Sequence, residues 1–310
     1  MKPVVVTGLS KKYGEVQALN GLEFEVGRGE IFGLIGPDGA GKTTLFRILT
    51  TLFIPDSGQA FVNGYDVVND YKQIRKIVGY MPGRFSLYQD LSVEENLKVF
   101  ATIFDSSIKE NYHLIKDIYQ HIEPFKARRA GALSGGMKQK LALCCALIHK
   151  PVILFLDEPT TGVDPVSRKE FWGMLKKLQD QGITILVSTP YMDEASMCNR
   201  IALIQDGRFL KIDTPKNIMD QFKNILWSVR SSRMSPLLKD LRDHKMVTTS
   251  FAFGDTHHVT IDQQYQSDAS DNLAKDQLTA YLQGKGHTEI SIQSIDATIE
   301  DCFMELSPPQ

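Results

Sequence analysis

Two short runs of the sequence are apolar at almost every position: EIFGLIG at residues 30–36 and VILFLD at residues 152–157. A strand with one wet face alternates apolar and polar residues, whereas a strand covered on both faces does not need to. Unbroken apolar runs are typical of parallel strands, whose sheets have helices on both faces. The two runs therefore predict the buried core of an α/β domain.

Helical patterns lie between and after these runs, in segments such as KTTLFRILTTLF, VEENLKVFATIF and SRKEFWGMLKKLQDQG. The last helix begins at Asp164 and Pro165, residues that suit a helix cap and a first turn, and it ends at Gly182. This alternation of strands and helices continues to about residue 213. The expected fold class is α/β with a parallel sheet.

The composition changes after residue 225, and we place a domain boundary there, between domains 1–225 and 226–310. From Trp227 the pattern reads strand, helix, two strands, helix, strand, helix, which predicts a small α+β layer of the ferredoxin-like type. This part has 12 Asp and Glu against 7 Lys and Arg, so it is a poor nucleic-acid binder. Neighbouring His257 and His258 point to opposite faces of a strand, which indicates a solvated surface rather than a metal site.

Composition narrows the function classes. The 310 residues carry a formal net charge of −2, so no basic surface indicates a nucleic-acid partner. No apolar run approaches the ~18 residues that span a bilayer, and the N-terminus does not read as a signal peptide. Four cysteines show no chelating or disulfide spacing, and we expect adjacent Cys144 and Cys145 in the core of a helix. These features predict a cytoplasmic protein.

The segment GPDGAGKTT, Gly36–Thr44, follows the first apolar run and opens a helix. Glycines let the backbone turn its N–H groups around phosphate oxygens at the positive end of the helix. Lys42 can reach the β- and γ-phosphates, and the Thr43 hydroxyl can bind Mg²⁺. The predicted nucleotide-binding residues of this segment are Gly36, Asp38, Gly39, Ala40, Gly41, Lys42, Thr43 and Thr44.

The second apolar run delivers two carboxylates to its tip. Asp157 can hold Mg²⁺ together with Thr43, and Glu158 can act as the general base that polarises an attacking water. A strand that simply ends in acidic turn residues is common. The phosphate segment upstream makes the catalytic interpretation the stronger one.

The segment LSGGM, Leu133–Met137, precedes another helical run. Ser134 can cap that helix, and Gly135 and Gly136 leave its first turn bare for a phosphate. Because the phosphates of the chain's own site are already wrapped, this helix end is better suited to a nucleotide held by another subunit. Taken alone, the segment could equally be a capped helix without a ligand.

Together these motifs resemble the ATP-binding cassette (ABC) family over roughly Val4–Asp213. In that resemblance GPDGAGKTT is the phosphate loop, LFLDEP the magnesium and base strand, and LSGGM, with Ser134, Gly135, Gly136 and Met137, the signature that acts on a partner's site. It implies a P-loop fold with a parallel-sheet core, an antiparallel subdomain and a helical insert. ATP and Mg²⁺ are the implied cofactors.

The resemblance also implies roles for two further residues and a set of partners. Tyr13 matches the aromatic residue that stacks on adenine, although it could also be a strand-edge aromatic. Asp164, in TTGVD, lies in the loop that contacts the partner subunit. The ending ATIEDCFMEL resembles ATP-binding subunits of bacterial multidrug-efflux transporters. The implied partners are a membrane permease and a second cassette, alike or different, so the chain would sit on the inner face of the cell membrane through the permease.

Three positions depart from the family pattern. Pro190, in ILVSTPYMDEA, stands where a histidine bonds the γ-phosphate, and proline offers no donor at all. Gly83 stands where a glutamine senses magnesium and water, and Gln89 is a poor substitute. Asp38 stands for an asparagine within the phosphate loop. Gly83 and Pro190 predict a site that binds ATP and hydrolyses it slowly, unless Arg84 or Thr189 takes over the lost roles.

Three functions follow from the sequence. The first is the ATPase subunit of an exporter, energising a separate permease. The second is an ATP-dependent clamp with little hydrolysis of its own, which completes a partner's site. The third is a soluble ABC protein that acts on ribosomes or DNA. Such proteins usually carry a second cassette, a coiled-coil insert or a basic arm, and this sequence has none of them.

Overall fold

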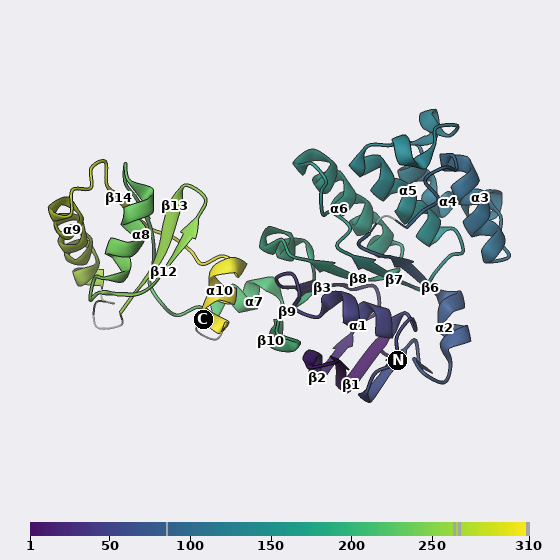
Figure 1. Cartoon of the computed structure of the whole chain (residues 1–310), viewed down its shortest axis with the longest axis horizontal. Coiled ribbons are helices and arrows are strands. Elements are labelled where there is room, and N and C mark those ends of the chain that lie inside the picture. Colours follow the sequence, from purple (N-terminus) through teal and green to yellow (C-terminus); the bar gives the residue numbers. More distant parts are fainter. Residues whose placement is uncertain (85, 263–264, 266–267, 308–310) are drawn as a thin grey trace. The chain divides into compact units, whose positions relative to one another are not determined.

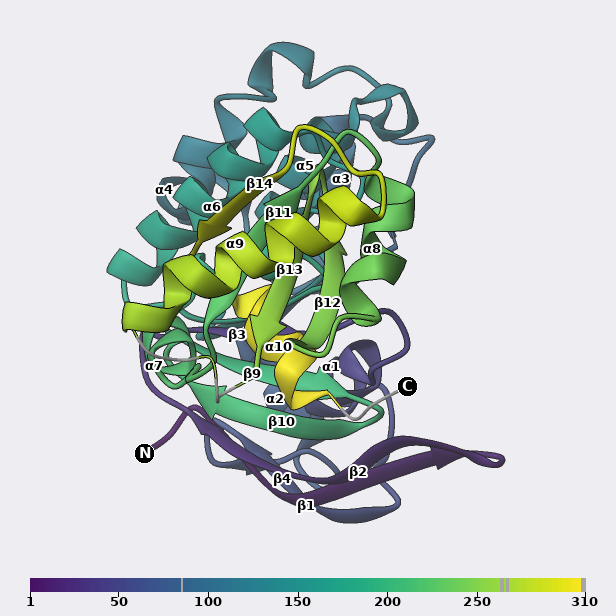
Figure 2. The ribbon, with the colours of Figure 1, turned by 90° about the vertical axis from the view of Figure 1, so that its left-hand side faces the viewer.

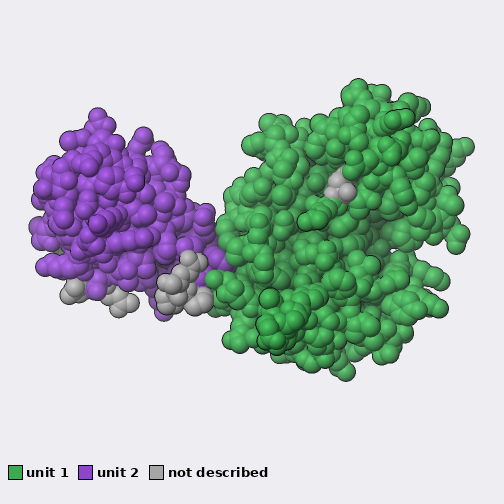
Figure 3. Space-filling view, viewed as in Figure 1, with its two compact units in different colours: residues 1–215, 309 green, residues 216–308, 310 purple. Residues whose placement is uncertain are grey.

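The computed structural model describes residues 1–84, 86–262, 265 and 268–307. The chain divides into two compact units, the first from Met1 to Pro215 and the second from Lys216 onward (Figure 3). The sequence placed this boundary at residue 225. The difference arises because residues after Pro215 pack on the C-terminal helix: Ile218 is buried, and its carbonyl accepts a hydrogen bond from the Cys302 thiol at 3.7 Å.

The first unit contains a six-stranded sheet in the order β10-β9-β3-β8-β7-β6. All neighbouring strands in it are parallel except β10 and β9. The strands are β3 (Ile31–Ile35), β6 (Val78–Met81), β7 (Ile153–Asp157), β8 (Thr184–Thr189), β9 (Arg200–Gln205) and β10 (Arg208–Asp213). Strands β3 and β7 are buried at every residue, which confirms the two-sided burial expected from their apolar runs.

A second sheet in this unit is antiparallel, in the order β2-β1-β4-β5. Its strands are β1 (Val4–Tyr13), β2 (Val16–Val26), β4 (Ser57–Val62) and β5 (Tyr65–Asp66). Helix α1 (Lys42–Leu49) lies between the two sheets (Figure 1). Its apolar residues share one core cluster with side chains of both sheets, such as Val6 and Phe155, so the helix that begins at Lys42 is held firmly on two sides.

The remaining helices of the first unit lie mainly on the other face of the six-stranded sheet (Figure 1). They are α2 (Tyr71–Ile77), α3 (Val93–Ile103), α4 (Ile108–Tyr119), α5 (Gly135–Leu147) and α6 (Pro165–Asp180), with the short 3-10 turns η1 (Glu123–Phe125), η2 (Ala130–Ala132) and η3 (Met192–Met197). Cys144 and Cys145 are buried in α5, as expected. The parallel core, the antiparallel sheet and the helical insert all match the fold class predicted from the sequence.

Helix α7 (Pro215–Asp220) begins at the boundary, and the second unit has the predicted element order. It contains β11 (Leu226–Arg230), α8 (Met234–Arg242), β12 (Val247–Phe253), β13 (Thr256–Ile261), α9 (Asp268–Gly284), β14 (Ser291–Ser294) and α10 (Ile299–Leu306). The sheet order is β12-β13-β11-β14, with every neighbouring pair antiparallel. Helices α8 and α9 lie over one face of this sheet (Figure 2). The ferredoxin-like class remains our interpretation of this arrangement.

The two neighbouring histidines of β13 are not solvated, so that expectation was wrong. They do point to opposite faces: His257 Nε2 bonds the Met234 carbonyl of α8 at 2.8 Å, and His258 Nδ1 bonds the Asp301 carboxylate of α10 at 2.8 Å. Stacking of His258 on Phe253, with 3.9 Å between the ring centroids, adds to its packing. The alternation of side chains along a strand predicted that the two histidines point to opposite faces, but it did not predict that α8 and α10 cover those faces.

None of the helices in the described part of the chain has both the length and the apolar run that a membrane span requires.

Candidate functional site

The phosphate loop follows β3 and turns sharply into α1. A Cβ atom at Gly36 would lie 2.1 Å from the Ile204 carbonyl oxygen, and at Gly41, where φ is +105°, one would lie 2.4 Å from the Ala18 carbonyl oxygen. Both positions therefore need glycine. Gly41 caps α1 without a side-chain hydrogen bond, so the first turn presents backbone N–H groups, as an anion site requires. Asp38 lies exposed on this loop.

Lys42 is buried within the loop that precedes it. Its side chain is only 3% exposed, and Nζ lies 3.3 Å from Glu158 Oε1. The same ammonium group donates to the carbonyl oxygens of Gly36 at 2.8 Å and Pro37 at 2.9 Å. A buried ammonium is stable only among acceptors and anions. The loop therefore holds a positive charge beside a bare helix end, an arrangement that fits phosphate.

The tip of β7 carries the two predicted carboxylates. Asp157 is 2% exposed and accepts a hydrogen bond from Ser188 Oγ of β8 at 2.7 Å. Glu158 has a left-handed backbone, with φ of +50°, and its N–H donates to the Ser188 carbonyl at 3.1 Å. A non-glycine residue in this conformation costs about 1–3 kcal/mol, a strain that is found both at active sites and in tight turns. The turn at Glu158 separates the two carboxylates, so that Glu158 pairs with Lys42.

Tyr80, on neighbouring strand β6, has a pKa that burial and the negative charge of Asp157 both shift. Burial and the Asp157 carboxylate raise the pKa of its phenol to about 12. Tyr80 therefore stays neutral at physiological pH and can act only as a hydroxyl beside the site.

The signature segment begins α5. Ser134 caps the helix by accepting from the Met137 N–H at 3.4 Å. A Cβ atom at Gly136 would lie 2.9 Å from the Ser167 hydroxyl, and one at Gly135 would lie 3.3 Å from the Gly162 carbonyl oxygen. The start of α5 therefore packs closely on the segment that leads into α6.

Asp164 caps α6 in the same way, by accepting from the Ser167 N–H at 3.0 Å. Hydrogen bonds from Ser167 lower the pKa of this exposed carboxyl, so it stays ionised. Both predicted caps, Ser134 and Asp164, thus begin helices on one surface formed by α5 and α6.

Tyr13 ends β1, and the residue is 41% exposed. It contacts Phe53 edge-on, with 6.1 Å between the ring centroids, and Phe53 donates its N–H to the Arg47 carbonyl in the last turn of α1. Tyr13 therefore lies toward the end of α1 opposite the phosphate loop. An exposed ring there can accept a stacked base.

A family profile described as ABC transporter matches residues 19–161. Over 304 residues the chain is 32% identical to the daunorubicin resistance ATP-binding protein DrrA2 of Streptomyces coeruleorubidus, a match that covers 96% of this chain and 93% of DrrA2. The chain belongs to the ABC transporter ATP-binding family.

Two further likenesses define how far the match extends. The cassette is 41% identical over 218 residues to the probable multidrug ABC transporter ATP-binding protein YbhF of Escherichia coli (strain K12), covering 70% of this chain but only 38% of YbhF. A solved dimer of the ATP-binding cassette MJ0796, in a post-hydrolysis state bound to ADP and Pi, has a TM-score of 0.61 and 26% identity, covering 68% of this chain and 98% of that one. The fold is thus that of an ABC ATPase.

Gly83 lies directly against the β7 tip of the cassette. A Cβ atom there would lie 3.0 Å from the Asp157 carbonyl oxygen and 3.7 Å from Glu158 Cβ. Gly83 therefore lies beside Glu158 and has no side chain to contribute. Gln89 is held elsewhere, since its carbonyl accepts from the Gly131 N–H at 2.9 Å in the approach to the signature.

Pro190 follows β8 beside the phosphate loop. The Thr189 carbonyl accepts from the Gly36 N–H at 3.4 Å, and the Thr189 hydroxyl accepts from the Tyr191 N–H at 3.1 Å. Thr189 is fully buried and already bonded across the joint. It is therefore a weak replacement for the missing histidine, whereas Arg84 is exposed.

Two contributors to the site were missed by the sequence. Ser188 binds both the Asp157 side chain and the Glu158 backbone, and Glu194 accepts from Thr160 and Arg168. The sequence did not indicate this role of Ser188, because neither strand sequence predicts that β7 pairs with β8. The acidic residues after Pro190 did give an indication, because a carboxylate close to a buried strand is stable only when it is paired with a donor or a cation.

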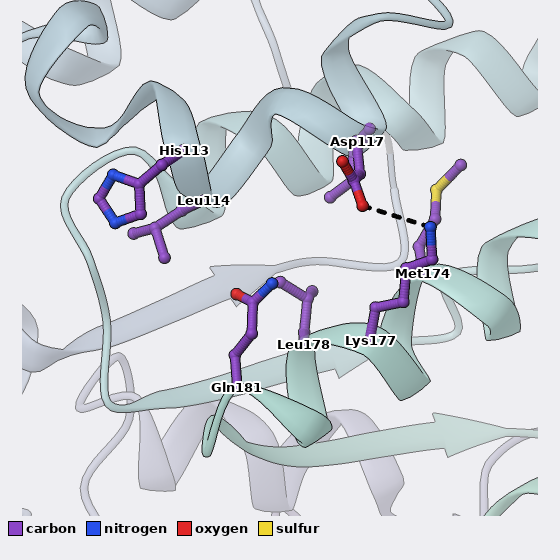
Figure 4. A pocket seen from close by; sticks show the side chains of 8 residues that line it. His113, Leu114, Asp117, Met174, Lys177, Leu178 and Gln181 are labelled. Atoms are coloured by element: carbon purple, nitrogen blue, oxygen red, sulfur yellow. Dashed lines mark hydrogen bonds and ion pairs between the residues drawn. The ribbon is translucent and has the colours of Figure 1, made fainter.

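A small pocket opens between α4 and α6 (Figure 4). Asp117 and Lys177 bridge its rim, with 3.2 Å between carboxylate and ammonium. Its lining residues are His113, Leu114, Asp117, Ile118, Met174, Lys177, Leu178 and Gln181. The pocket contains none of the predicted site residues, so it is separate from the phosphate site.

Proposed function

We propose that this chain is the ATP-binding subunit of an ABC exporter, and that it energises a separate membrane permease from the cytoplasmic side. The observation that carries the proposal is the buried Lys42, held between the phosphate loop and Glu158. The names of the relatives, multidrug transporter for YbhF and daunorubicin resistance for DrrA2, support export as the direction. The chain spans only about two fifths of YbhF, at 38%, so a fused second half is one alternative to a separate partner.

The bare first turn of α1 and Lys42 would hold the phosphates of ATP, and Tyr13 would stack on its adenine. Thr43 and Asp157 would supply oxygen ligands for Mg²⁺, the ligand type that this hard cation prefers. Bound Mg²⁺ would neutralise charge on the phosphates. Glu158 would orient and deprotonate the attacking water. For that it must release Lys42, whose ammonium would then face the phosphates.

Hydrolysis at this site would be slow, because Gly83 and Pro190 supply no side-chain hydrogen bond. Removing one preorganised donor commonly costs about 10²–10³ in rate, although grouped effects do not add. The second function that this observation favours is an ATP-dependent clamp. Its signature residues, Ser134 to Met137, would complete the site of a second cassette while its own site held ATP.

The test is to purify the full chain and measure both binding and turnover. We expect it to bind a fluorescent ATP analogue in the presence of Mg²⁺, and to hydrolyse ATP slowly when alone. Failure of the wild-type chain to bind the analogue would sink the proposal. Binding with no hydrolysis, even beside its co-purified permease and cassette partners, would decide for the clamp.

A further inference from the structure

A buried carboxylate connects the two segments that flank the site. Glu194 lies in η3, after the Pro190 joint, and is only 3% exposed. Its Oε2 accepts from the Thr160 hydroxyl at 3.1 Å, and its Oε1 accepts from Arg168 Nε at 3.0 Å. Thr160 is 1% exposed and comes two residues after Glu158. Glu194 thus joins the segment after β8 to the segment after β7.

The guanidinium of Arg168, on α6, pairs with this buried carboxylate, with 3.0 Å between Nε and Oε1 of Glu194. A buried carboxylate without a cation loses its hydration and gains nothing in return, so it is stable only when paired. The same guanidinium donates to the Asp193 carboxylate at 3.1 Å and lies 4.2 Å from the Tyr191 ring centroid. Tyr191 directly follows Pro190. Arg168 therefore contacts the segment after β8 through an aromatic ring as well as through two carboxylates.

Each connected segment ends on groups that face the phosphate loop. Along β8, the Thr189 carbonyl accepts from the Gly36 N–H at 3.4 Å, and along β7, Glu158 lies 3.3 Å from Lys42. Thr161 also donates its hydroxyl to Glu158 Oε2 at 3.4 Å. A shift of either segment would therefore move a group that contacts the loop.

We propose that Arg168 is a positioning residue for ATP hydrolysis at this site, because through Glu194 it fixes the Pro190 joint and the Thr160 segment against each other. The inference rests on the proposed ATPase function. Gly83 and Pro190 place no side-chain donor beside Glu158. The alignment of Glu158 with the attacking water therefore depends more strongly on the backbone positions of the two segments. A misplacement of about 1 Å can cost a hundredfold in rate.

The direct test is hydrogen–deuterium exchange of the full chain over residues 158–164 and 189–198. Arg168→Met keeps an unbranched apolar stem, shorter than that of arginine, and removes the charge, and Glu194→Gln keeps the shape of the partner. We expect either change to raise exchange about threefold or more in both segments together, since lost local contacts lower the free energy of local opening. A rise confined to one segment would overturn the coupling.

Lys140→Met is the matched control. It removes a second ion pair of α6, in which Lys140 Nζ lies 2.7 Å from Glu170. Lys140 is buried, at 8% exposure, and its loss leaves the half-exposed Glu170 carboxylate of α6 without this cation. It should leave exchange in both segments unchanged. Equal effects of Lys140→Met and Arg168→Met would reduce Arg168 to general support of α6 and overturn the proposal.

Single-turnover hydrolysis and the affinity for trinitrophenyl-ATP complete the test. Arg168→Met should slow hydrolysis about tenfold and leave the affinity within about twofold, whereas Arg168→Lys should recover part of the rate. An unchanged rate despite faster exchange would contradict the positioning role, as would a wild-type chain that binds the analogue but never hydrolyses ATP. Failure of the proposed function is distinct, because the wild-type chain would then not bind trinitrophenyl-ATP at all.

Discussion

Lys42 and Glu158 form an ion pair across the site, with 3.3 Å between Nζ and Oε1. It joins the start of α1 to the tip of β7, two elements separated by more than a hundred residues of sequence. The Glu158 carboxylate and a bound phosphate would therefore compete for the same ammonium group of Lys42. Loss of Lys42 should therefore weaken nucleotide binding, whereas loss of the Glu158 carboxylate should not.

Lys42→Ala should weaken binding of a fluorescent ATP analogue by about tenfold or more, because a charge-assisted hydrogen bond contributes roughly 1.5–3 kcal/mol. Equilibrium titration in the presence of Mg²⁺ measures this. Lys140→Ala is the control, since it removes another buried lysine of the same unit. Undiminished affinity in Lys42→Ala would show that this loop does not hold the phosphates.

Glu158→Gln should bind the same analogue at least as tightly as the wild-type chain, because it removes the carboxylate that competes for Lys42. Its hydrolysis rate should fall, and the fall should be modest if the wild-type rate is already small. Titration and steady-state turnover of the two proteins check both statements. A clearly weaker affinity in Glu158→Gln would mean that the ion pair supports the loop rather than competing with phosphate.

The double change Gly83→Gln with Pro190→His should raise the hydrolysis rate about tenfold or more, since each restores a donor of the kind that commonly contributes 10²–10³. Gly83 does not require a left-handed backbone, but a Cβ atom would lie 3.0 Å from the Asp157 carbonyl oxygen. The β7 tip must therefore yield by a few tenths of an ångström. The two single variants are the controls. A brisk wild-type rate that Glu158→Gln abolishes would instead show that other groups already replace both residues.

Much of the site could be predicted because its motifs are short and contiguous. The glycines of the phosphate loop, the caps Ser134 and Asp164, and the acidic tip of β7 each depend on neighbours in the sequence, so the sequence alone describes them. The parallel core followed from unbroken apolar runs for the same reason.

What the sequence did not predict depends on residues far apart in the chain. The carboxylate of Asp157 is held by Ser188, and Arg168 reaches Glu194 from another element. In the second unit, His287 is bonded at both ring nitrogens, by Ser231 and Asp240. No periodicity or spacing encodes such pairs, because they form only after the strands take their places in the sheets.

His149 should make the first unit acid-sensitive. Its ring stacks on Phe104 and bonds the Val78 carbonyl at 2.9 Å, and burial lowers the pKa of the imidazole below its usual value near 6.5. The unfolded chain then binds more protons than the folded one below that pH, so stability is lost as the pH falls through about 6.5. Urea unfolding between pH 7.5 and 5.5 measures this. His149→Gln, which cannot titrate, should show a smaller loss over that range, and an equal loss would assign the acid sensitivity to other groups.

Ser134→Arg should do its damage in a partner's site rather than in its own. Ser134 is exposed and caps α5, so the change removes a cap worth about 1 kcal/mol and places a long cation on the surface formed with Asp164. The variant should bind the ATP analogue as well as the wild-type chain does, because Lys42 and its loop are untouched.

The measurement is steady-state turnover of the variant alone and mixed with a co-purifying competent cassette. Ser134→Ala is the control, since it loses the same cap without adding bulk or charge. We expect Ser134→Arg to silence the mixed complex and Ser134→Ala to leave most of its activity, because only the arginine blocks closure of the two surfaces. A mixed complex that keeps full turnover with Ser134→Arg would mean that this helix end does not complete a partner's site.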